Sequence, residues 1–322
     1  MRTITCSILL LFAMLVHAEV APAQAYPNRS IRVLVPALPG DACDVLSRLL
    51  GQKMGERLGQ QLVIDNRPGA TGTIGLAIVA QATPDGYTIA CGQAGNMSVV
   101  LQVMKTMPYD SIKDFTAISL LATNYLALVV NPNLPIKTVD DLIKHAKANP
   151  GKVSFASNGE GSFLHFAAEL FRTQVGITYL HVPFKGVSQM ATELIGGRVD
   201  AAFTSFTGVL PYVKGGRLRL LGVAKSKRAE NYPDFPAIAE TVPGFESGGW
   251  FGFVAPAATP KNIVALLNKE ANDAMRQPDV REKMTALGLE GWSESPEYFG
   301  KLIRSDYQKY GKLARDVGMQ KQ

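Results

Sequence analysis

The sequence is poor in cysteine and aromatic residues, and beyond its amino-terminal segment it has no hydrophobic run long enough to span a bilayer. Cysteine accounts for 3 of the 322 residues and aromatic residues for 8%. A membrane-spanning helix needs about 20 apolar residues, so an integral membrane protein is not expected. Hydrophobic residues nevertheless make up 47% of the chain, which is enough for the cores of two ordinary domains. We therefore expect a globular protein.

Residues 1–25 have the pattern of a secretory signal peptide. The apolar centre Ile8–Val16 is too short to cross a bilayer, and Ala23–Ala25 is a small-residue cleavage signature. A lipoprotein anchor would need a cysteine just after the apolar centre, whereas Cys6 lies before it. We predict cleavage after Ala25 and an exported, soluble mature protein.

The chain has only a mild excess of positive charge, formally +6. The predicted signal peptide holds one basic residue, Arg2, and one acidic residue, Glu19, so its removal leaves this value unchanged. Basic residues are scattered apart from the short run Lys225–Arg228, and no aromatic stripe is interleaved with them. Nucleic acid is therefore not an expected partner.

After signal cleavage only Cys43 and Cys91 remain. Both follow predicted strands, and in an oxidising compartment they can form a disulfide if their Cα atoms lie within about 7 Å. Two buried free thiols are the alternative. Two cysteines and the dispersed His145, His165 and His181 do not predict a metal site, and no cofactor is expected.

Short β-rich runs alternate with helical segments, which predicts an α/β fold with parallel strands. Leu46, Leu50, Met54 and Leu58 mark the first helix by their spacing of four residues. Further helix starts are expected at Thr138 with Asp141, at Thr259-Pro260 and at Ser295-Pro296. The expected strands are 31–36, 61–65, 86–90, 115–121, 125–132, 152–157, 178–184, 199–205, 218–224 and 248–256.

Two of these strands, 125–132 and 248–256, end at proline and are typical of a two-stranded hinge between two lobes. We predict crossings near residues 125–131 and 248–255. The first lobe would comprise residues 26–125 plus 250–322, and the second lobe residues 126–249. The protein is expected to be a monomer.

Two strand-to-helix turns, Val35–Asp44 and Ser157–Ser162, are candidate ligand sites, because ligands of parallel α/β lobes bind beyond the carboxyl ends of the strands. Gly159 and Gly161 allow backbone N–H groups to approach an anion, and Ser162 is the expected N-cap of the next helix. Neither turn contains Lys or Arg. A purely structural turn is the alternative, but one such turn in each lobe favours ligand binding.

His165 and the third glycine-rich turn, Asn66–Gly75, are open cases. His165 lies in the first turn of its helix, where the helix dipole is expected to keep it neutral. It either contacts ligand or packs at the hinge. Asn66–Gly75 is either a structural loop or a further ligand contact.

A serine hydrolase using Ser157 or Ser162 is the alternative from another functional class. Ser162 and His165 share one helical turn, whereas a catalytic hydroxyl and its imidazole base normally come from different elements. The chain has no G-x-S-x-G elbow and no phosphate loop, and Leu164 replaces the last glycine of a dinucleotide fingerprint. We therefore expect a binding protein and not an enzyme.

Ordered motifs along the mature chain, among them "YPNRSIRVLVP", "PGDACDVLSR", "DNRPGATG", "ATPDGYT", "SNGEGSFLH", "HVPFKG" and "GGRVDAAF", resemble those of the Bug family, also called TctC-like. These are periplasmic solute-binding receptors of tripartite tricarboxylate transporters. The resemblance implies the type II periplasmic-binding-protein fold, a small organic carboxylate as ligand, and membrane transporter subunits as partners. An exported sensor for a membrane signalling partner is the alternative.

The resemblance places the ligand-binding residues in the two turns and at a few other cleft positions: Leu38, Gly40, Asp41, Ala42, Asp44, Ser157, Asn158, Gly159, Gly161, Ser162, His165, Lys185, Gly186, Thr204 and Ser205. The chain departs from the family pattern at Ala37, which replaces an aromatic residue and would widen the pocket, and at Asp41 and Thr71, which replace glycines. The Asp41 carboxylate would repel a second ligand carboxylate and favour an ammonium or amide group, by about 1 to 4 kcal/mol in a partly buried cleft. We therefore expect a monocarboxylate, such as an amino acid or an aromatic acid, rather than a tricarboxylate.

Overall fold

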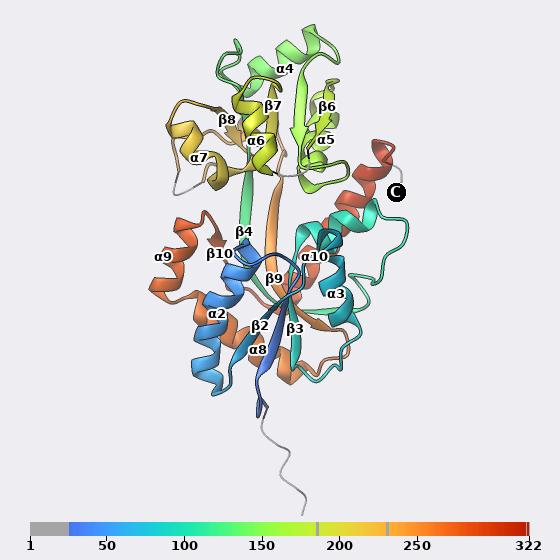
Figure 1. The fold of residues 1–322 in the computed structure, drawn as a ribbon, viewed down its shortest axis with the longest axis vertical. Coiled ribbons are helices and arrows are strands. Elements are labelled where there is room, and N and C mark those ends of the chain that lie inside the picture. The colour runs from blue at the N-terminus through green and yellow to red at the C-terminus, as the bar shows by residue number, and fades with distance from the viewer. Residues whose placement is uncertain (1–25, 185–186, 230–231, 320, 322) are drawn as a thin grey trace, which may run out of the picture.

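A computed structural model describes residues 26–184, 187–229, 232–319 and 321. The predicted signal peptide lies outside these residues, as do Lys185 and Gly186. Figure 1 shows two lobes connected by two long strands, β4 (Phe115–Val130) and β9 (Gly248–Pro256). The expected two-lobed α/β architecture is confirmed.

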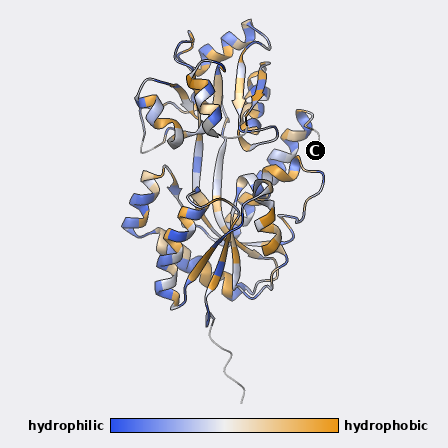
Figure 2. Cartoon of the chain, viewed as in Figure 1, coloured by the Kyte–Doolittle hydropathy of each residue, from blue (hydrophilic) through white to orange (hydrophobic). Residues whose placement is uncertain are grey.

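The first lobe is built on parallel strands β2 (Leu62–Asn66), β1 (Ile31–Val35) and β3 (Thr88–Gln93), in that spatial order, followed by the antiparallel strands β9 and β4. The side chains of β1 alternate between two cores: Val33 packs toward helices α2 and α8, and Leu34 toward α3 and α10. Figure 2 shows hydrophobic residues concentrated on these central strands. The helices are α2 (Ala42–Leu58), α3 (Thr73–Ala80), α8 (Lys261–Met275), α9 (Pro278–Ala286) and α10 (Pro296–Asp316).

The second lobe has one core, formed around strands β5 (Ser154–Ser157), β6 (Leu180–Pro183), β7 (Ala201–Ser205), β8 (Arg219–Val223) and the end of β4. Strand β5 is parallel to β6 and β7, and β4 is antiparallel to β7 and β8. Phe203 lies at the centre of this core, with ring centroids 5.8 Å from Phe171 and 5.6 Å from Phe245. The helices are α4 (Val139–Ala148), α5 (Phe163–Val175), α6 (Val187–Ile195) and α7 (Phe206–Lys214).

Strand β4 is continuous where the sequence predicted two strands. Its residues Phe115–Tyr125 pair with β9, and its residues Leu126–Val130 pair with β7 and β8. Register shifts in the β9 pairing absorb the irregular stretch before Tyr125, so no turn interrupts the strand. The first crossing lies at the start of the predicted range 125–131. Ser247 still bonds to Ala224 of the second lobe, so the chain returns to the first lobe at the start of the predicted range 248–255.

Side-chain caps begin four of the described helices, namely α2, α4, α5 and α10. Thr138 and Asp141 form the predicted capping box, and Ser295 accepts a hydrogen bond from the Tyr298 N–H at 3.2 Å. The predicted start at Thr259 is wrong by one residue: the N-cap position is Pro260, and the Thr259 hydroxyl donates to the Pro256 carbonyl instead.

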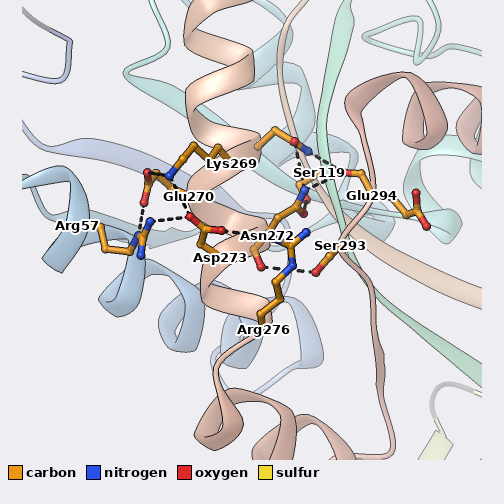
Figure 3. Close-up of polar contacts among 10 residues, drawn as sticks. Arg57, Ser119, Lys269, Glu270, Asn272, Asp273, Arg276, Ser293 and Glu294 are labelled. Carbon is orange, nitrogen blue, oxygen red and sulfur yellow. Dashed lines mark hydrogen bonds and ion pairs between the residues drawn. The ribbon is translucent and has the colours of Figure 1, made fainter.

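Helix α8 is held in place by polar contacts on both sides (Figure 3). Arg57 of α2 pairs with Glu270 and, at 2.6 Å, with Asp273. On the other side, the Asn272 amide accepts from the Ser119 hydroxyl of β4 at 3.0 Å and donates to the Glu294 carbonyl at 3.1 Å. Because the buried Asn272 has partners for both of its amide atoms, its burial is not penalised.

The two cysteines expected in the mature chain are neighbours. Cys43 and Cys91 are free and buried, and their sulfur atoms lie 2.6 Å apart. Burial, followed by the hydrogen bond with Cys91, raises the pKa of the Cys43 thiol well above its usual range. Oxidation in the folded state should therefore be slow, because the thiolate is the reactive form.

We expect Cys43 and Cys91 to form a disulfide when the chain folds in an oxidising compartment, with both thiol protons and two electrons passing to a thiol–disulfide oxidant. Closing this loop would stabilise the fold by up to about 4 kcal/mol. Alkylation of the denatured, exported protein followed by mass measurement should find no free thiol, and reductant should lower the melting temperature. A Cys43→Ala/Cys91→Ala variant is the control and should not respond to reductant. Two alkylated cysteines in protein never exposed to reductant would contradict the expectation.

Candidate functional site

Two adjoining pockets lie between the lobes, with volumes of about 380 and 210 Å³. Both are lined by Thr71 and Val100 of the first lobe and by Asn158, Gly161 and Ser162 of the second. The larger pocket is completed by Ala70, Val103, Met104, Gly159, Glu160 and Met319. The smaller one extends toward the hinge and is completed by Gln93, Ala94, Gly95, Val99, Asn124, Phe163, Gly249, Trp250 and Phe251.

The turn Ser157–Ser162, here called the glycine loop, brings the amino terminus of α5 to both pockets. Gly159 and Gly161 have φ values of +130° and +66°, which side-chain-bearing residues rarely adopt. Ser162 is the predicted N-cap, and its hydroxyl accepts from the His165 N–H at 3.3 Å. The N–H groups of the first helical turn have no partners within the helix and carry the positive end of its dipole. This end of α5 is therefore suited to an anion.

Two stacked histidines support the glycine loop from within the second lobe. The rings of His165 and His181 lie 3.7 Å apart and are nearly parallel, at 11°. His165 Nδ1 accepts from the Gly161 N–H at 3.1 Å, and His181 Nε2 lies 2.7 Å from the Ser157 hydroxyl. The same hydroxyl lies 2.9 Å from the Gly159 carbonyl oxygen. The two rings thus fix the backbone of the loop near both glycines.

His165 is neutral, as expected, although the main cause is burial. Its side chain is 7% exposed, and burial followed by the neighbouring His181 lowers its pKa to about 4. Burial also lowers the pKa of His181, against the opposing effect of Glu160 and Glu169. Because Nδ1 accepts a hydrogen bond, the ring proton of His165 must be on Nε2. His165 packs beneath the loop and lines neither pocket.

The turn at residues 38–44 lies at the carboxyl end of β1, and its two aspartates hold the backbone. Asp41 is the N-cap of α2 and accepts from the Cys43 N–H at 3.1 Å. Asp44 is 3% exposed, accepts from the Gly40 N–H at 2.9 Å and pairs with Arg48. Burial opposes ionisation of Asp44, but the hydrogen bonds from Arg48 and Gly40 keep its pKa below the usual value.

The remaining sequence-predicted positions of this turn do not reach the two pockets either. Leu38 is 66% exposed, and Ala42 is the first residue of α2. Ala37 packs against the core of the first lobe, and its carbonyl accepts from Asn66. In this structure the larger pocket is therefore formed without the turn 38–44.

Thr204 and Ser205 end strand β7 beside β4, where they pair with Ala127 and Leu126. Thr204 is buried, and its hydroxyl has no hydrogen-bond partner among the described residues. Ser205 occupies the N-cap position of α7. Neither residue lines the two pockets. Lys185 and Gly186, also predicted as site residues, lie outside the described residues.

Sequence reasoning missed several lining residues. The third glycine-rich turn, left open above, contributes Ala70 and Thr71, both with positive φ. In the sequence, the replacement of the family's glycine by Thr71 was the feature that pointed to this turn. Val100, Val103 and Met104 follow a π-helical turn, Gly95–Val99, and had no signal, since their apolar pattern is the same as that of core residues. Met319 had none either.

The charge of the lining is unusual for an anion site. Among the lining residues of both pockets, as far as the structure describes them, Glu160 is the one ionisable side chain. Neither pocket is lined by Lys, Arg or His. One carboxylate can be held by N–H groups and hydroxyls at α5, but a second would have no cation beside it.

Comparison with known protein families gives a match over residues 46–319 to the tripartite tricarboxylate transporter family receptor, TctC. The chain belongs to this family. A UPF0065 protein from a Pseudomonas species is 39% identical over 90% of this chain and 86% of its own. BugT of Bordetella pertussis is 34% identical over 92% of this chain and 91% of its own. An R. palustris protein solved with adipate has a TM-score of 0.80 and 32% identity, over 92% of this chain and 100% of its own.

These relatives confirm the resemblance to the Bug and TctC-like receptors and the periplasmic-binding-protein fold. The TctC family consists of solute-binding receptors and not enzymes, so the hydrolase reading of Ser162 does not hold. No helix within the described residues is long and apolar enough to cross a membrane. Cleavage after Ala25 stays a prediction.

Because His165 is neutral in the folded state, we expect the stability of this receptor to depend on pH. Its folded pKa of about 4 lies below the usual 6.5, so the unfolded chain binds more protons between these values. The stability that the neutral His165 contributes is fully present above pH 6.5. It is lost as the pH falls toward 4, by about 2 to 3 kcal/mol in the free energy of unfolding. In His165→Asn the side-chain oxygen can replace Nδ1 as the acceptor for Gly161. Urea unfolding at pH 7, 5.5 and 4.5 should therefore give a smaller loss of stability for this variant. Equal losses in both proteins would disprove the assignment.

Proposed function

We propose that this protein is an exported receptor that captures a small organic monocarboxylate between its lobes and delivers it to a membrane transporter of the tripartite tricarboxylate type. The lobes are residues 26–125 plus 250–322 and residues 126–249, and the receptor acts as a monomer. The observation that carries the proposal is that the start of α5 opens onto two interlobe pockets whose described lining residues include no basic side chain.

The carboxylate is bound by the glycine loop. The Gly159 N–H donates to the Ser157 hydroxyl and the Gly161 N–H to His165, so internal hydrogen bonds fix the shape of the loop. The carboxylate is bound by N–H groups at the start of α5 and by the Ser162 hydroxyl, where the helix dipole favours a negative charge. A ligand with micromolar affinity needs about 8 kcal/mol, net of the cost of ordering the lobes around it. The relative solved with adipate supports a carboxylate ligand, although adipate has two carboxylates and the ligand proposed here has one.

The turn 38–44 closes on the ligand from the first lobe, where Leu38, Gly40, Asp41 and Ala42 are the contacts. Asp44 fixes the turn through Gly40 and Arg48 and does not itself reach the ligand. Asp41, although it caps α2, keeps a carboxylate at the edge of the cleft and disfavours a second negative charge on the ligand. On the second lobe Lys185, Gly186, Thr204 and Ser205 complete the closed site, and the unpartnered Thr204 hydroxyl is suited to a ligand oxygen.

Two serine N-caps provide a matched test of this proposal. Ser162→Ala and Ser295→Ala each remove a capping hydroxyl, and each should reduce stability by about 1 kcal/mol. Only Ser162 lines the pockets, so only Ser162→Ala should also weaken ligand binding, by about tenfold.

Native mass spectrometry of the purified receptor would give the mass of a co-purified ligand, and titration calorimetry would give its affinity for both variants. A ligand that is not a carboxylate, or equal loss of affinity in the two variants, would refute the proposed binding mode.

A further inference from the structure

The carboxyl-terminal helix links the first lobe to the helix that carries the glycine loop. Tyr310 of α10 is fully buried, with its ring 5.9 Å from Phe163 and 5.8 Å from Phe166 of α5, both edge-on. Leu313 and Ala314 complete this cluster. Figure 1 shows the end of α10, in red, beside the second lobe. The end of α10 is therefore held close to the glycine loop.

The end of α10 directs Met319 into the larger pocket. Gly318 has a φ of +70°, its N–H donates to the Arg315 carbonyl at 3.2 Å, and the Met319 N–H donates to the Ala314 carbonyl at 2.9 Å. These two bonds form a Schellman motif, in which the residue after the glycine folds back over the helix end. Met319 packs partly buried against the Tyr310 cluster and lines the pocket.

The wall opposite the glycine loop is apolar. Val100, Val103 and Met104 line it from the first lobe. The loop lies close to this wall, since a Cβ added to Gly161 would come within 3.1 Å of the Val103 methyl groups. A group that enters beside Val103 and Met319 would thus leave water and meet hydrocarbon and thioether atoms, with Glu160 as the one charged neighbour among the lining residues described.

We propose that Met319, with Val103 and Met104, forms an apolar subsite for the hydrocarbon body of the monocarboxylate whose charged end is held at the glycine loop. This rests on the proposed function and assigns it a ligand class: monocarboxylates with an extended apolar body. The pocket of about 380 Å³ has room for such a body, and flexible methionine side chains adapt to its shape.

Hexanoate and adipate form a matched pair of probes, because they differ only in the second carboxylate. Calorimetry should give at least tenfold tighter binding of hexanoate, since the second carboxylate of adipate would be desolvated beside Met319 without a cation. From butanoate to hexanoate each added methylene should tighten binding by about fourfold. Adipate binding as tightly as hexanoate would overturn the subsite and the restriction to monocarboxylates, while leaving the proposed role as a carboxylate receptor intact.

Variants of the chain end test the role of Met319 itself. Met319→Ala should weaken hexanoate binding by about tenfold and hardly change butanoate binding. Gly318→Ala should also weaken hexanoate binding, because alanine disfavours the positive φ that positions Met319. Met319→Lys places a cation in the subsite and should raise the affinity for adipate relative to hexanoate. Met107→Ala, a partly buried methionine that lines neither pocket, is the matched control.

The outcomes distinguish failure of the apolar subsite from failure of the proposed function. If Met319→Ala binds hexanoate as tightly as the parent protein, the subsite is refuted. If Met319→Ala does not fold, the ratio of the affinities for adipate and hexanoate is compared between Met319→Lys and the parent protein. An unchanged ratio then refutes the subsite. If none of these carboxylates binds, and native mass spectrometry finds no carboxylate ligand, the proposed function fails as well.

Discussion

The pairing of β4 with β9 is the interaction on which the two-lobed arrangement depends. These two strands are the connection seen between the lobes in Figure 1, and they run side by side from Phe115 to Tyr125 of β4. At the hinge end, Gly248 and Gly249 lie against Asn124, whose side-chain oxygen accepts from the Gly249 N–H at 2.9 Å. A Cβ at either glycine would come within 2.6 Å of Asn124 atoms. Larger residues would push the strands apart where the smaller pocket begins.

Contacts on both sides of this strand pair restrain the lobes. On one side Lys225, just after β8, forms an ion pair with Glu290 of β10 (Glu290–Gly291), and its ammonium lies 4.8 Å from the centre of the Tyr125 ring. On the other side the Tyr310 cluster joins α10 to α5. The pockets lie between these restraints. A change in the angle between the lobes must therefore alter the pocket walls contributed by α5 and by the chain end together, which is what a receptor that responds to its ligand requires.

Local rules in the sequence were sufficient for most of the strands and for several helices, and they pointed to one of the turns that line the pockets. The spacing of apolar residues predicted α2, and the caps Ser162 of α5 and Ser295 of α10 were identified from residue type and position alone. Glycines between a strand and a helix pointed to the glycine loop. Each of these signals acts over a few residues, where backbone geometry and capping outweigh tertiary packing.

What the sequence did not predict is determined by contacts between distant segments. The continuity of β4 depends on pairing with β9, which lies more than a hundred residues later in the chain. Val103, Met104 and Met319 have the pattern of ordinary core residues, and only the packing of α10 against α5 brings them to one pocket. The double role of Asp41 is a similar case. Residue type suggested a charge facing ligand, while the structure shows the same carboxylate capping α2.

The stacked histidines explain how pockets with no basic side chain among their described lining residues are suited to hold an anion in a fixed position. A protonated His165 would add a favourable positive charge near the ligand, but its Nδ1 could no longer accept from the Gly161 N–H. The loop would then lose the bond that sets the direction of its second glycine. Burial and the facing His181 ring keep His165 neutral. The geometry of the loop is therefore preserved, and His165 adds no positive charge near the pockets. In the proposed binding mode, oriented N–H groups recognise one carboxylate at one position, and the shape and polarity of the pocket select the rest of the ligand.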